Sequence, residues 1–217
     1  MPDAYCELEP YELTKKQKFY RAFKRFCDIF VGIIGLFVCI LPFIIIAIII
    51  KSDSKGPALF VQPRIGRNGK LFKCFKFRTM RTDANHAIAP YEYADAEANI
   101  TKIGKFLRKT SLDELPQVFN LLNGTMSLIG YRPSQIVETE LNTAREKLNL
   151  YQLYPGISGW AQINGRDELA AKPTLKAKYD GYYLNNFSAK LDFKIFFITI
   201  CKVLRRADVK EGKIENK

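Results

Sequence analysis

An uncharged run of 22 residues limits what this chain can fold into more than any other feature of its sequence. It covers residues 29–50, IFVGIIGLFVCILPFIIIAIII. A straight helix of that length reaches about 33 Å, which is enough to cross the apolar core of a bilayer. A secretory signal is shorter and is followed by a small-residue cleavage site, and a core helix seldom needs so many consecutive apolar residues. The run therefore predicts insertion into a membrane.

Basic residues flank this run on both sides, which restricts how it can cross. Six lysines and arginines stand in residues 15–25 and six more in residues 51–73. The positive-inside rule places both flanks on the cytoplasmic side, and a straight span cannot satisfy that. Pro42, within the run, removes one backbone hydrogen bond and kinks a helix. We therefore predict a re-entrant helix that enters, breaks near Pro42 and returns to the same face. A tilted span with a harmless kink is the alternative.

Two other segments favour contact with a membrane surface. Residues 18–26, KFYRAFKRF, alternate aromatic and basic side chains at helical spacing. Residues 191–206, LDFKIFFITICKVLRR, are strongly apolar and end in two arginines. Each can lie in the headgroup layer with its rings buried and its charges near lipid phosphates. For residues 191–206, a last helix of the soluble core is an equally good interpretation.

The balance of charge indicates an anionic partner. The formal net charge is +12, from 34 basic and 22 acidic residues, which suits nucleic acid, an acidic membrane surface or a phosphorylated substrate. No zinc-finger spacing or RNA-recognition run is present, which argues against nucleic acid. The five cysteines form no Cys-x-x-Cys pair and there is one histidine, so neither a zinc site nor a disulfide framework is expected. A reducing compartment fits best.

The remainder of the chain predicts one small α+β domain that is mainly helical. Two short strands within residues 58–80 are expected to form a β-hairpin at Asn68–Gly69, a favoured tight-turn pair. The other expected elements are helices over 115–124, 134–151 and 174–186, a structured loop over 154–168 that packs Trp160, and a loop over 82–100. The predicted organisation is a basic amphipathic segment (1–28), the membrane helix (29–50), a cytoplasmic domain (51–206) and a polar tail (207–217).

Two adjacent carboxylates, Asp113 and Glu114, allow two interpretations. Ser111 followed three residues later by Glu114 matches a capping box, with the serine as the N-cap of a helix, and in isolation this structural interpretation is favoured. Acidic residues in a first helical turn also suit the helix dipole. However, successive helical residues point about 100° apart, so both carboxylates cannot serve one cap. If Glu114 caps the helix, Asp113 projects towards the basic residues around it.

Clusters of basic residues favour a chemical role for the two acids. These clusters are Lys73, Lys76, Arg78 and Arg81; Lys105, Arg108 and Lys109; and the turn residues Arg132 and Arg166. Most of the lysines fit a solvated surface, but arginine beside exposed backbone amides suits phosphate oxygens. A carboxylate in such a surface can hold Mg²⁺ or attack phosphorus. The local chemistry indicates phosphoryl transfer at a membrane surface.

Four motifs in order carry a resemblance to a known family. They are KFRTM (76–80), SLDELPQ (111–117), GTMSLIGYRP (124–133) and PGISGWAQINGR (155–166). The chain resembles the bacterial sugar transferases, monotopic phosphoglycosyl transferases that start glycan assembly on polyprenyl phosphate, from about residue 20 to residue 206. Members with an amino-terminal multi-span domain also exist, and this chain looks like the minimal form. The resemblance agrees with a kinked re-entrant helix at residues 29–50.

The resemblance implies a reaction in which a sugar phosphate moves from a UDP-sugar to undecaprenyl phosphate, with release of UMP. Asp113 is then the nucleophile that forms a covalent intermediate, and Glu114 is its partner in holding Mg²⁺ or moving protons. The implied substrate-binding residues are Lys76, Arg78, Arg108, Arg132 and Arg166, the last of them in the nucleotide site. The implied location is the cytoplasmic face of a bacterial inner membrane, among membrane lipids. Downstream glycosyltransferases and a homodimeric partner are left open.

Three positions depart from the family pattern. Tyr131 stands where proline usually precedes the arginine, Thr125 replaces an aspartate, and Leu41 replaces a serine before the membrane proline. Two alternatives follow: an inactive relative, or a non-catalytic basic protein that binds anionic lipids at the membrane. The intact pair Asp113–Glu114 argues against both, because neither alternative requires it.

Both flanks of residues 29–50 are expected on the cytoplasmic side. A cysteine substituted for Asp3 should therefore resist a membrane-impermeant thiol reagent added from the periplasm, and react only after the membrane is opened. Labelling from the periplasm in intact cells would contradict the re-entrant topology.

Overall fold

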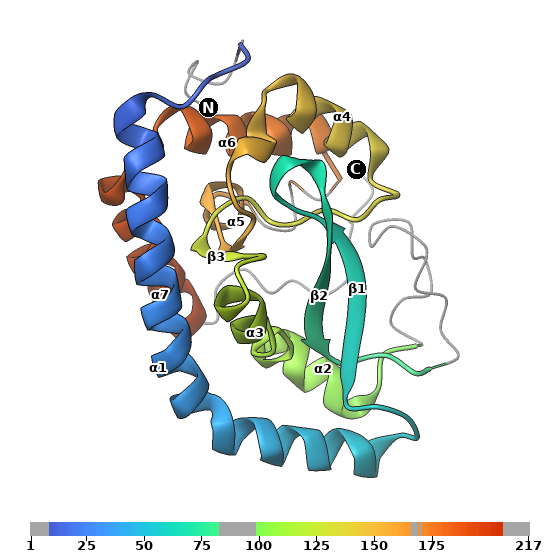
Figure 1. The fold of residues 1–217 in the computed structure, drawn as a ribbon. Coiled ribbons are helices and arrows are strands. Elements are labelled where there is room, and N and C mark those ends of the chain that lie inside the picture. Colours follow the sequence, from blue (N-terminus) through green and yellow to red (C-terminus); the bar gives the residue numbers. More distant parts are fainter. Residues whose placement is uncertain (1–8, 83–98, 166–168, 170, 206–217) are drawn as a thin grey trace.

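Helix α1 (Lys15–Asp53), 39 residues long, runs along one side of the molecule and then turns across its lower edge (Figure 1). It belongs to a computed structural model that describes residues 9–82, 99–165, 169 and 171–205. A capping box starts the helix, since Thr14 Oγ1 accepts from the Gln17 amide at 3.2 Å and Gln17 Oε1 accepts from the Thr14 amide at 3.0 Å. Residues 15–28 of the predicted basic segment and the predicted membrane helix thus form one continuous helix.

Helix α1 remains helical through Pro42, so the predicted kink does not interrupt the helix, and the re-entrant insertion stays a prediction. Figure 1 shows a bend in the second half of the helix, the half that contains Pro42. A proline removes one i to i−4 hydrogen bond, which bends a helix without requiring it to end. By length and composition α1 could cross a membrane, and only 11% of its most apolar 18-residue window is buried. That exposure is unlike a core helix.

The β-hairpin is confirmed. Strands β1 (Leu59–Ile65) and β2 (Leu71–Phe77) are antiparallel, with Leu59 opposite Phe77 and Ile65 opposite Leu71. Asn68 and Gly69 in the connection have φ angles of 57° and 70°, the left-handed region that Asn and Gly adopt most readily.

The next described segment after the hairpin contains the two acids, Asp113 and Glu114, and is called the acid-bearing segment. It consists of α2 (Lys102–Lys109), a 3₁₀ turn at Leu112–Glu114 and α3 (Gln117–Leu122). A small apolar cluster joins α1, β2 and α2 through Ile46, Ile50, Phe77 and Leu107, all at most 8% exposed. The end of α1 is thereby packed directly against the elements that present the acids.

The carboxyl-terminal half surrounds a second, parallel pair of strands, β3 (Ser127–Ile129) and β4 (Gly156–Ser158). The helices around it are α4 (Thr139–Lys147), α5 (Trp160–Ile163), α6 (Pro173–Asn185) and α7 (Ala189–Arg205). The prediction of a helix over 174–186 is confirmed. The helix expected over 134–151 is shorter, since α4 covers only Thr139–Lys147. The loop expected over 154–168 includes β4 and α5. Strand β4 was missed because its parallel partner is distant in sequence and leaves no local signal.

Helix α7 is a helix of the core, as one of the two interpretations for residues 191–206 held, and its contact with a membrane surface stays a prediction. Ile195 is fully buried in the larger apolar core, whereas Phe193 and Phe197 are 64% and 60% exposed. The buried Asp192 accepts hydrogen bonds from Tyr20 at 2.7 Å and from Tyr183 at 2.6 Å. One face of α7 therefore packs on the core and against α1, and the other leaves large apolar side chains uncovered.

Two charged side chains of α1 hold it against the acid-bearing segment. Arg25 donates to the carbonyl oxygens of Leu121 at 2.6 Å and Leu122 at 3.0 Å, which lie at the end of α3. Asp28, 4% exposed, accepts from the Leu128 amide of β3 at 3.0 Å. These bonds satisfy backbone groups that a helix end and a strand would otherwise leave open.

Replacement of Gly104 by alanine is expected to destabilise the fold. A Cβ atom at Gly104 would overlap the carbonyl oxygen of Thr79, which is itself fixed by a hydrogen bond from the Thr101 amide. Overpacking of this kind costs roughly 1–3 kcal/mol. Thermal denaturation of Gly104→Ala in detergent should show a lower Tm than wild type. Lys105→Ala, at an exposed position of the same helix, is the control and should not; equal Tm values for both variants would contradict the close approach.

Candidate active site

The backbone at Ser111 excludes the capping box. Ser111 precedes the 3₁₀ turn with a φ of 56°, and its side chain makes no capping hydrogen bond, so the bond from the serine that defines a capping box is missing. The Glu114 side chain is directed elsewhere, towards basic residues of other elements. The structural interpretation of the acid pair is therefore wrong, because tertiary partners hold Glu114 in place of its own helix start.

Two cations from different elements bind Glu114. Lys76 Nζ, from β2, lies 2.9 Å from Glu114 Oε1. Arg132, just after β3, donates from Nη2 to Oε1 at 2.6 Å and from Nη1 to Oε2 at 3.4 Å, a forked arrangement. The Glu114 carboxylate raises the pKa of Arg132 in turn. The hairpin, the acid-bearing turn and the chain after β3 thus meet at one carboxylate.

Asp113 lies beside this ion pair and is nearly enclosed. It is 8% exposed, and this burial raises the pKa of its carboxyl group, with the Glu114 charge acting in the same direction. Lys76, Arg132 and Arg108 lower that pKa through their charges. Arg108 is positioned by a hydrogen bond from its Nε to Thr79 Oγ1 at 2.9 Å. A carboxylate among several cations can react with a phosphorylated substrate without strong charge repulsion.

The Arg78 side chain bonds the chain at the end of α1, away from the other predicted binding residues. It is 5% exposed, and its guanidinium donates to Lys55 O at 2.9 Å, Ser54 O at 2.7 Å and Ser54 Oγ at 2.9 Å. These bonds fix the chain where α1 ends. The substrate-binding role implied for Arg78 stays a prediction, and Arg166 lies outside the described residues. The structure brings Lys76, Arg108 and Arg132 together around the acid pair.

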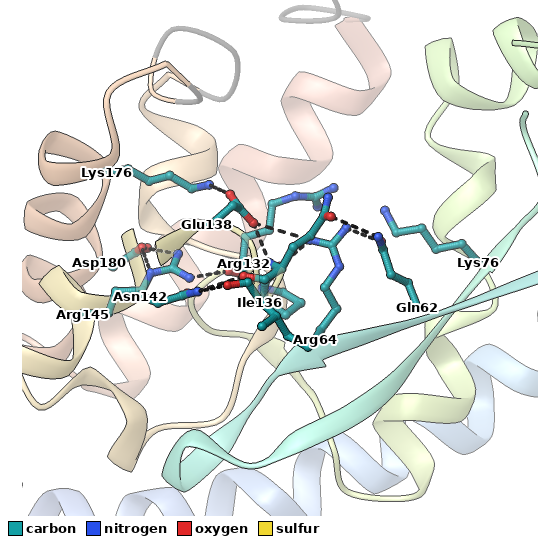
Figure 2. Close-up of polar contacts among 12 residues, drawn as sticks. Gln62, Arg64, Lys76, Arg132, Ile136, Glu138, Asn142, Arg145, Lys176 and Asp180 are labelled. Atoms are coloured by element: carbon teal, nitrogen blue, oxygen red, sulfur yellow. Dashed lines mark hydrogen bonds and ion pairs between the residues drawn. The ribbon is translucent and has the colours of Figure 1, made fainter. Parts of the chain in front are cut away.

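A buried ion pair that the sequence did not predict supports the backbone of Arg132 (Figure 2). Arg145 of α4 and Asp180 of α6 pair at 2.5 Å, with side-chain exposures of 0% and 1%. Arg145 Nη1 also donates to the Arg132 carbonyl oxygen at 3.0 Å. No local signal could have found this pair, because its members stand 35 residues apart in sequence.

Arg64 and Glu138 extend the same network towards the hairpin (Figure 2). Arg64, on β1, donates to Pro133 O at 3.1 Å and to Gln62 Oε1 at 2.7 Å. Glu138 lies 3.9 Å from Arg64 and 3.8 Å from Lys176. Burial lowers the pKa of Arg64, and the Arg132 charge adds to that effect. The segment that presents Arg132 is therefore held on both sides.

Two departures from the family pattern have structural roles. The Tyr131 side chain is 1% exposed, and the Arg145 guanidinium lies over its ring at 5.1 Å from the centroid. Thr125 Oγ1 accepts from Asn120 Nδ2 at 3.0 Å, and Asn120 also bonds the β2 backbone at Phe75 N, 2.9 Å away. Both residues thus stabilise the elements around the acid pair.

Trp160 packs inside the structure, as expected. It is 8% exposed, and its ring stacks on that of Tyr182 with the centroids 5.0 Å apart.

The acid pair suits a magnesium ion by its chemistry. Asp113 and Glu114 offer carboxylate oxygens, the ligand type that Mg²⁺ prefers. Among the described residues no group of three or more His, Cys, Asp or Glu side chains gathers as a metal site would. Mg²⁺ is commonly held by one or two carboxylates together with substrate phosphates, so two acids fit a metal that arrives with its substrate.

Comparison with known proteins defines the class of this chain. The bacterial sugar transferase family matches residues 19–206. The chain therefore belongs to this family, and the resemblance inferred from four motifs is confirmed. The match includes the acid pair, its cations and most of α1.

Curated relatives agree on the class. A galactosyl transferase, CpsE, of Streptococcus agalactiae serotype III is 41% identical over 206 residues, which cover 88% of this chain and 45% of the relative. An undecaprenyl-phosphate glucose phosphotransferase of Komagataeibacter xylinus is 40% identical, with coverages of 82% and 35%. A UDP-N-acetylgalactosamine-undecaprenyl-phosphate N-acetylgalactosaminephosphotransferase of Aeromonas hydrophila is 37% identical, with coverages of 85% and 44%. The chain spans less than half the length of these relatives.

Lys176→Met is expected to stabilise the protein at neutral pH. Burial lowers the pKa of Lys176 from 10.5 to about 8, so the folded state disfavours its charge. Below pH 8 Lys176 is protonated in both the folded and the unfolded state. The buried charge then destabilises the folded state by its full amount, about 3 kcal/mol at most. Between pH 8 and 10.5 the folded state releases the proton first, so wild-type stability rises relative to the variant.

The measurement is the difference in Tm between Lys176→Met and wild type at several pH values. The variant should be the more stable at pH 7, and the difference should shrink as the pH approaches 10.5. Lys190→Met, at an exposed lysine, serves as the control and should show little difference at any pH. A difference that does not change with pH would contradict the lowered pKa.

Proposed function

We propose that this protein transfers a sugar-1-phosphate from a UDP-sugar to a polyprenyl phosphate and releases UMP. The observation that carries the proposal is the buried Asp113 beside a Glu114 carboxylate that is held by Lys76 and Arg132. The names of two relatives support the same donor and acceptor classes, undecaprenyl phosphate in both and a UDP-sugar in one. The lipid-linked product would begin the assembly of a polysaccharide or another glycan, which downstream glycosyltransferases would extend.

Asp113 is the proposed nucleophile. Its carboxylate oxygen attacks the phosphorus that carries the sugar, a bond from that phosphorus to the bridging oxygen breaks, and UMP leaves with the bridging oxygen. A phosphate oxygen of the polyprenyl phosphate then attacks the same phosphorus and displaces the Asp113 carboxylate. The product is a polyprenyl diphosphate sugar, and the enzyme returns to its starting state. One site serves both substrates in turn.

The cations around Asp113 make this attack feasible. A carboxylate and a diphosphate repel each other, and Lys76, Arg108 and Arg132 offset that repulsion with charges already in position. Glu114 orients Lys76 and Arg132 through its two oxygens. Because the bonds to Glu114 exist before substrate arrives, little reorganisation accompanies the reaction.

Mg²⁺ is the cofactor we propose, held by Asp113 and Glu114 together with donor phosphates. When bound, it would neutralise part of the charge that develops on the leaving phosphate. Removal of divalent cations by a chelator would then lower turnover.

A membrane location follows from the same proposal, because the acceptor phosphate stands at the headgroup level of a bilayer. The apolar, exposed surface of α1 supports insertion, and the basic residues on both of its flanks support a re-entrant arrangement at the cytoplasmic face of a bacterial inner membrane. An enzyme so placed need not draw a long lipid into water.

Asp113→Asn should abolish turnover, because an amide cannot form the covalent intermediate. UMP release would be measured with a panel of UDP-sugars, Mg²⁺ and undecaprenyl phosphate. We expect release with at least one donor for wild type and a loss of at least about 10³-fold in the variant, with membrane association unchanged. Asp53→Asn, at an exposed acid near the end of α1, is the matched control and should stay active. An active Asp113→Asn enzyme would rule out the covalent mechanism.

A further inference from the structure

The turn that presents Arg132, residues 132–135, is held through each of its four carbonyl oxygens. Every one of them accepts a hydrogen bond from β1 or α4. In the order of the acceptors, the donors are Arg145 Nη1 at 3.0 Å, Arg64 Nη1 at 3.1 Å, the Ile65 amide at 3.1 Å and Asn142 Nδ2 at 2.9 Å. The backbone of this turn is therefore fixed by elements distant from it in sequence.

Glu138 lies beside this turn, between two cations (Figure 2). Its Oε2 accepts from the Gln135 amide at 2.5 Å and lies 3.9 Å from Arg64 Nη1. Its Oε1 lies 3.8 Å from Lys176 Nζ, and the side chain is only 10% exposed. A carboxylate withdrawn from water in this way needs cations close to it, and Arg64 and Lys176 supply them.

Arg64 is also within electrostatic reach of Glu114, the carboxylate that Arg132 binds. Burial and the Arg132 charge lower the pKa of Arg64, whereas the charges of Glu138 and Glu114 act in the opposite direction. The Arg64 Nε is buried and has no hydrogen-bond partner among the described residues. A buried N–H without a partner is costly, and a carboxylate is a strong acceptor for a guanidinium. Arg64 and Arg132 can therefore compete for Glu114.

We propose that Glu138 is a positioning residue that retains Arg64 at the turn, so that Arg132 and Lys76 alone share Glu114. The inference rests on the proposed function, in which Arg132 offsets the charge of the donor phosphates, and it adds a residue that acts through Arg64 and Arg132. Without the Glu138 charge, the buried Arg64 guanidinium loses its nearest carboxylate and is drawn to Glu114. Arg132 is then displaced, because the two guanidinium groups repel each other.

Four variants test this role. Glu138→Gln removes the charge but keeps an oxygen that can accept from the Gln135 amide, and Glu138→Asp keeps the charge on a shorter side chain. Arg64→Met removes the competing cation and is made alone and together with Glu138→Gln. Glu146→Gln, at an exposed glutamate of α4, is the matched control. Steady-state UMP release would be measured in detergent-lipid micelles with undecaprenyl phosphate and a UDP-sugar that wild type accepts, and the Tm of each variant would be recorded.

Glu138→Gln should lower kcat/KM for the UDP-sugar at least about tenfold, and Glu138→Asp should lower it less. The double variant should be at least about threefold more active than Glu138→Gln alone, because no second arginine then competes for Glu114. Its turn keeps the backbone bonds from Arg145, Ile65 and Asn142. Two independent structural losses would instead add, and the double variant would be the least active. Glu146→Gln should match wild type.

Several results would overturn the inference. Wild-type kinetics in Glu138→Gln would show that the Glu138 charge does not position Arg132. A double variant no more active than Glu138→Gln, or a Glu138→Gln variant whose Tm falls below the assay temperature, would assign Glu138 a purely structural role. Each of these results, with an active wild type, refutes the inference alone. If wild type releases no UMP with any donor, the proposed function fails and the inference fails with it.

Discussion

The bonds between Glu114 and the cations Lys76 and Arg132 hold the acid pair together with the two sheets. Lys76 belongs to β2 and Arg132 to the chain after β3, so one carboxylate joins elements that are separated by more than 50 residues in sequence. A buried charge is costly unless it is paired and hydrogen-bonded. The pairing therefore fixes the orientation of Glu114, and the neighbouring Asp113 is the carboxylate that we propose as the nucleophile.

A second set of buried contacts keeps Arg132 in place. The ion pair of Arg145 and Asp180 reaches the Arg132 backbone, and Tyr131 packs under the Arg145 guanidinium. Helices α4 and α6 thus support the site through the Arg132 backbone. This arrangement gives a physical reason for a tyrosine before Arg132, since its ring supports the residue that holds the Arg132 backbone.

Helix α1 couples this polar centre to an apolar surface. Arg25 bonds the end of α3 and Asp28 bonds β3, and Gly35 and Glu114 both line one cavity. The same helix exposes apolar side chains along most of its length. The proposed reaction joins a nucleotide in water to a lipid in a bilayer, and α1 lies where the polar and apolar surfaces meet.

Local patterns in the sequence were sufficient for much of this structure. The apolar run, the turn at Asn68–Gly69, the helix over 174–186 and the ordered motifs around Asp113 and Glu114 are properties of neighbouring residues, and they predicted α1, the hairpin, α6 and the family. What the sequence could not supply were the contacts between distant segments: the β3–β4 pair, the ion pair of Arg145 and Asp180, and the partners of Glu114.

Ser111 and Glu114 matched a capping box by spacing, but tertiary ion pairs outweighed that local preference. Likewise, Arg78 is basic by sequence, and only packing directs it to the end of α1. Local conformational preferences are weak, whereas pairing buried charges is obligatory, so the sequence determined α1, the hairpin and α6, and the tertiary structure decided which side chains form the site.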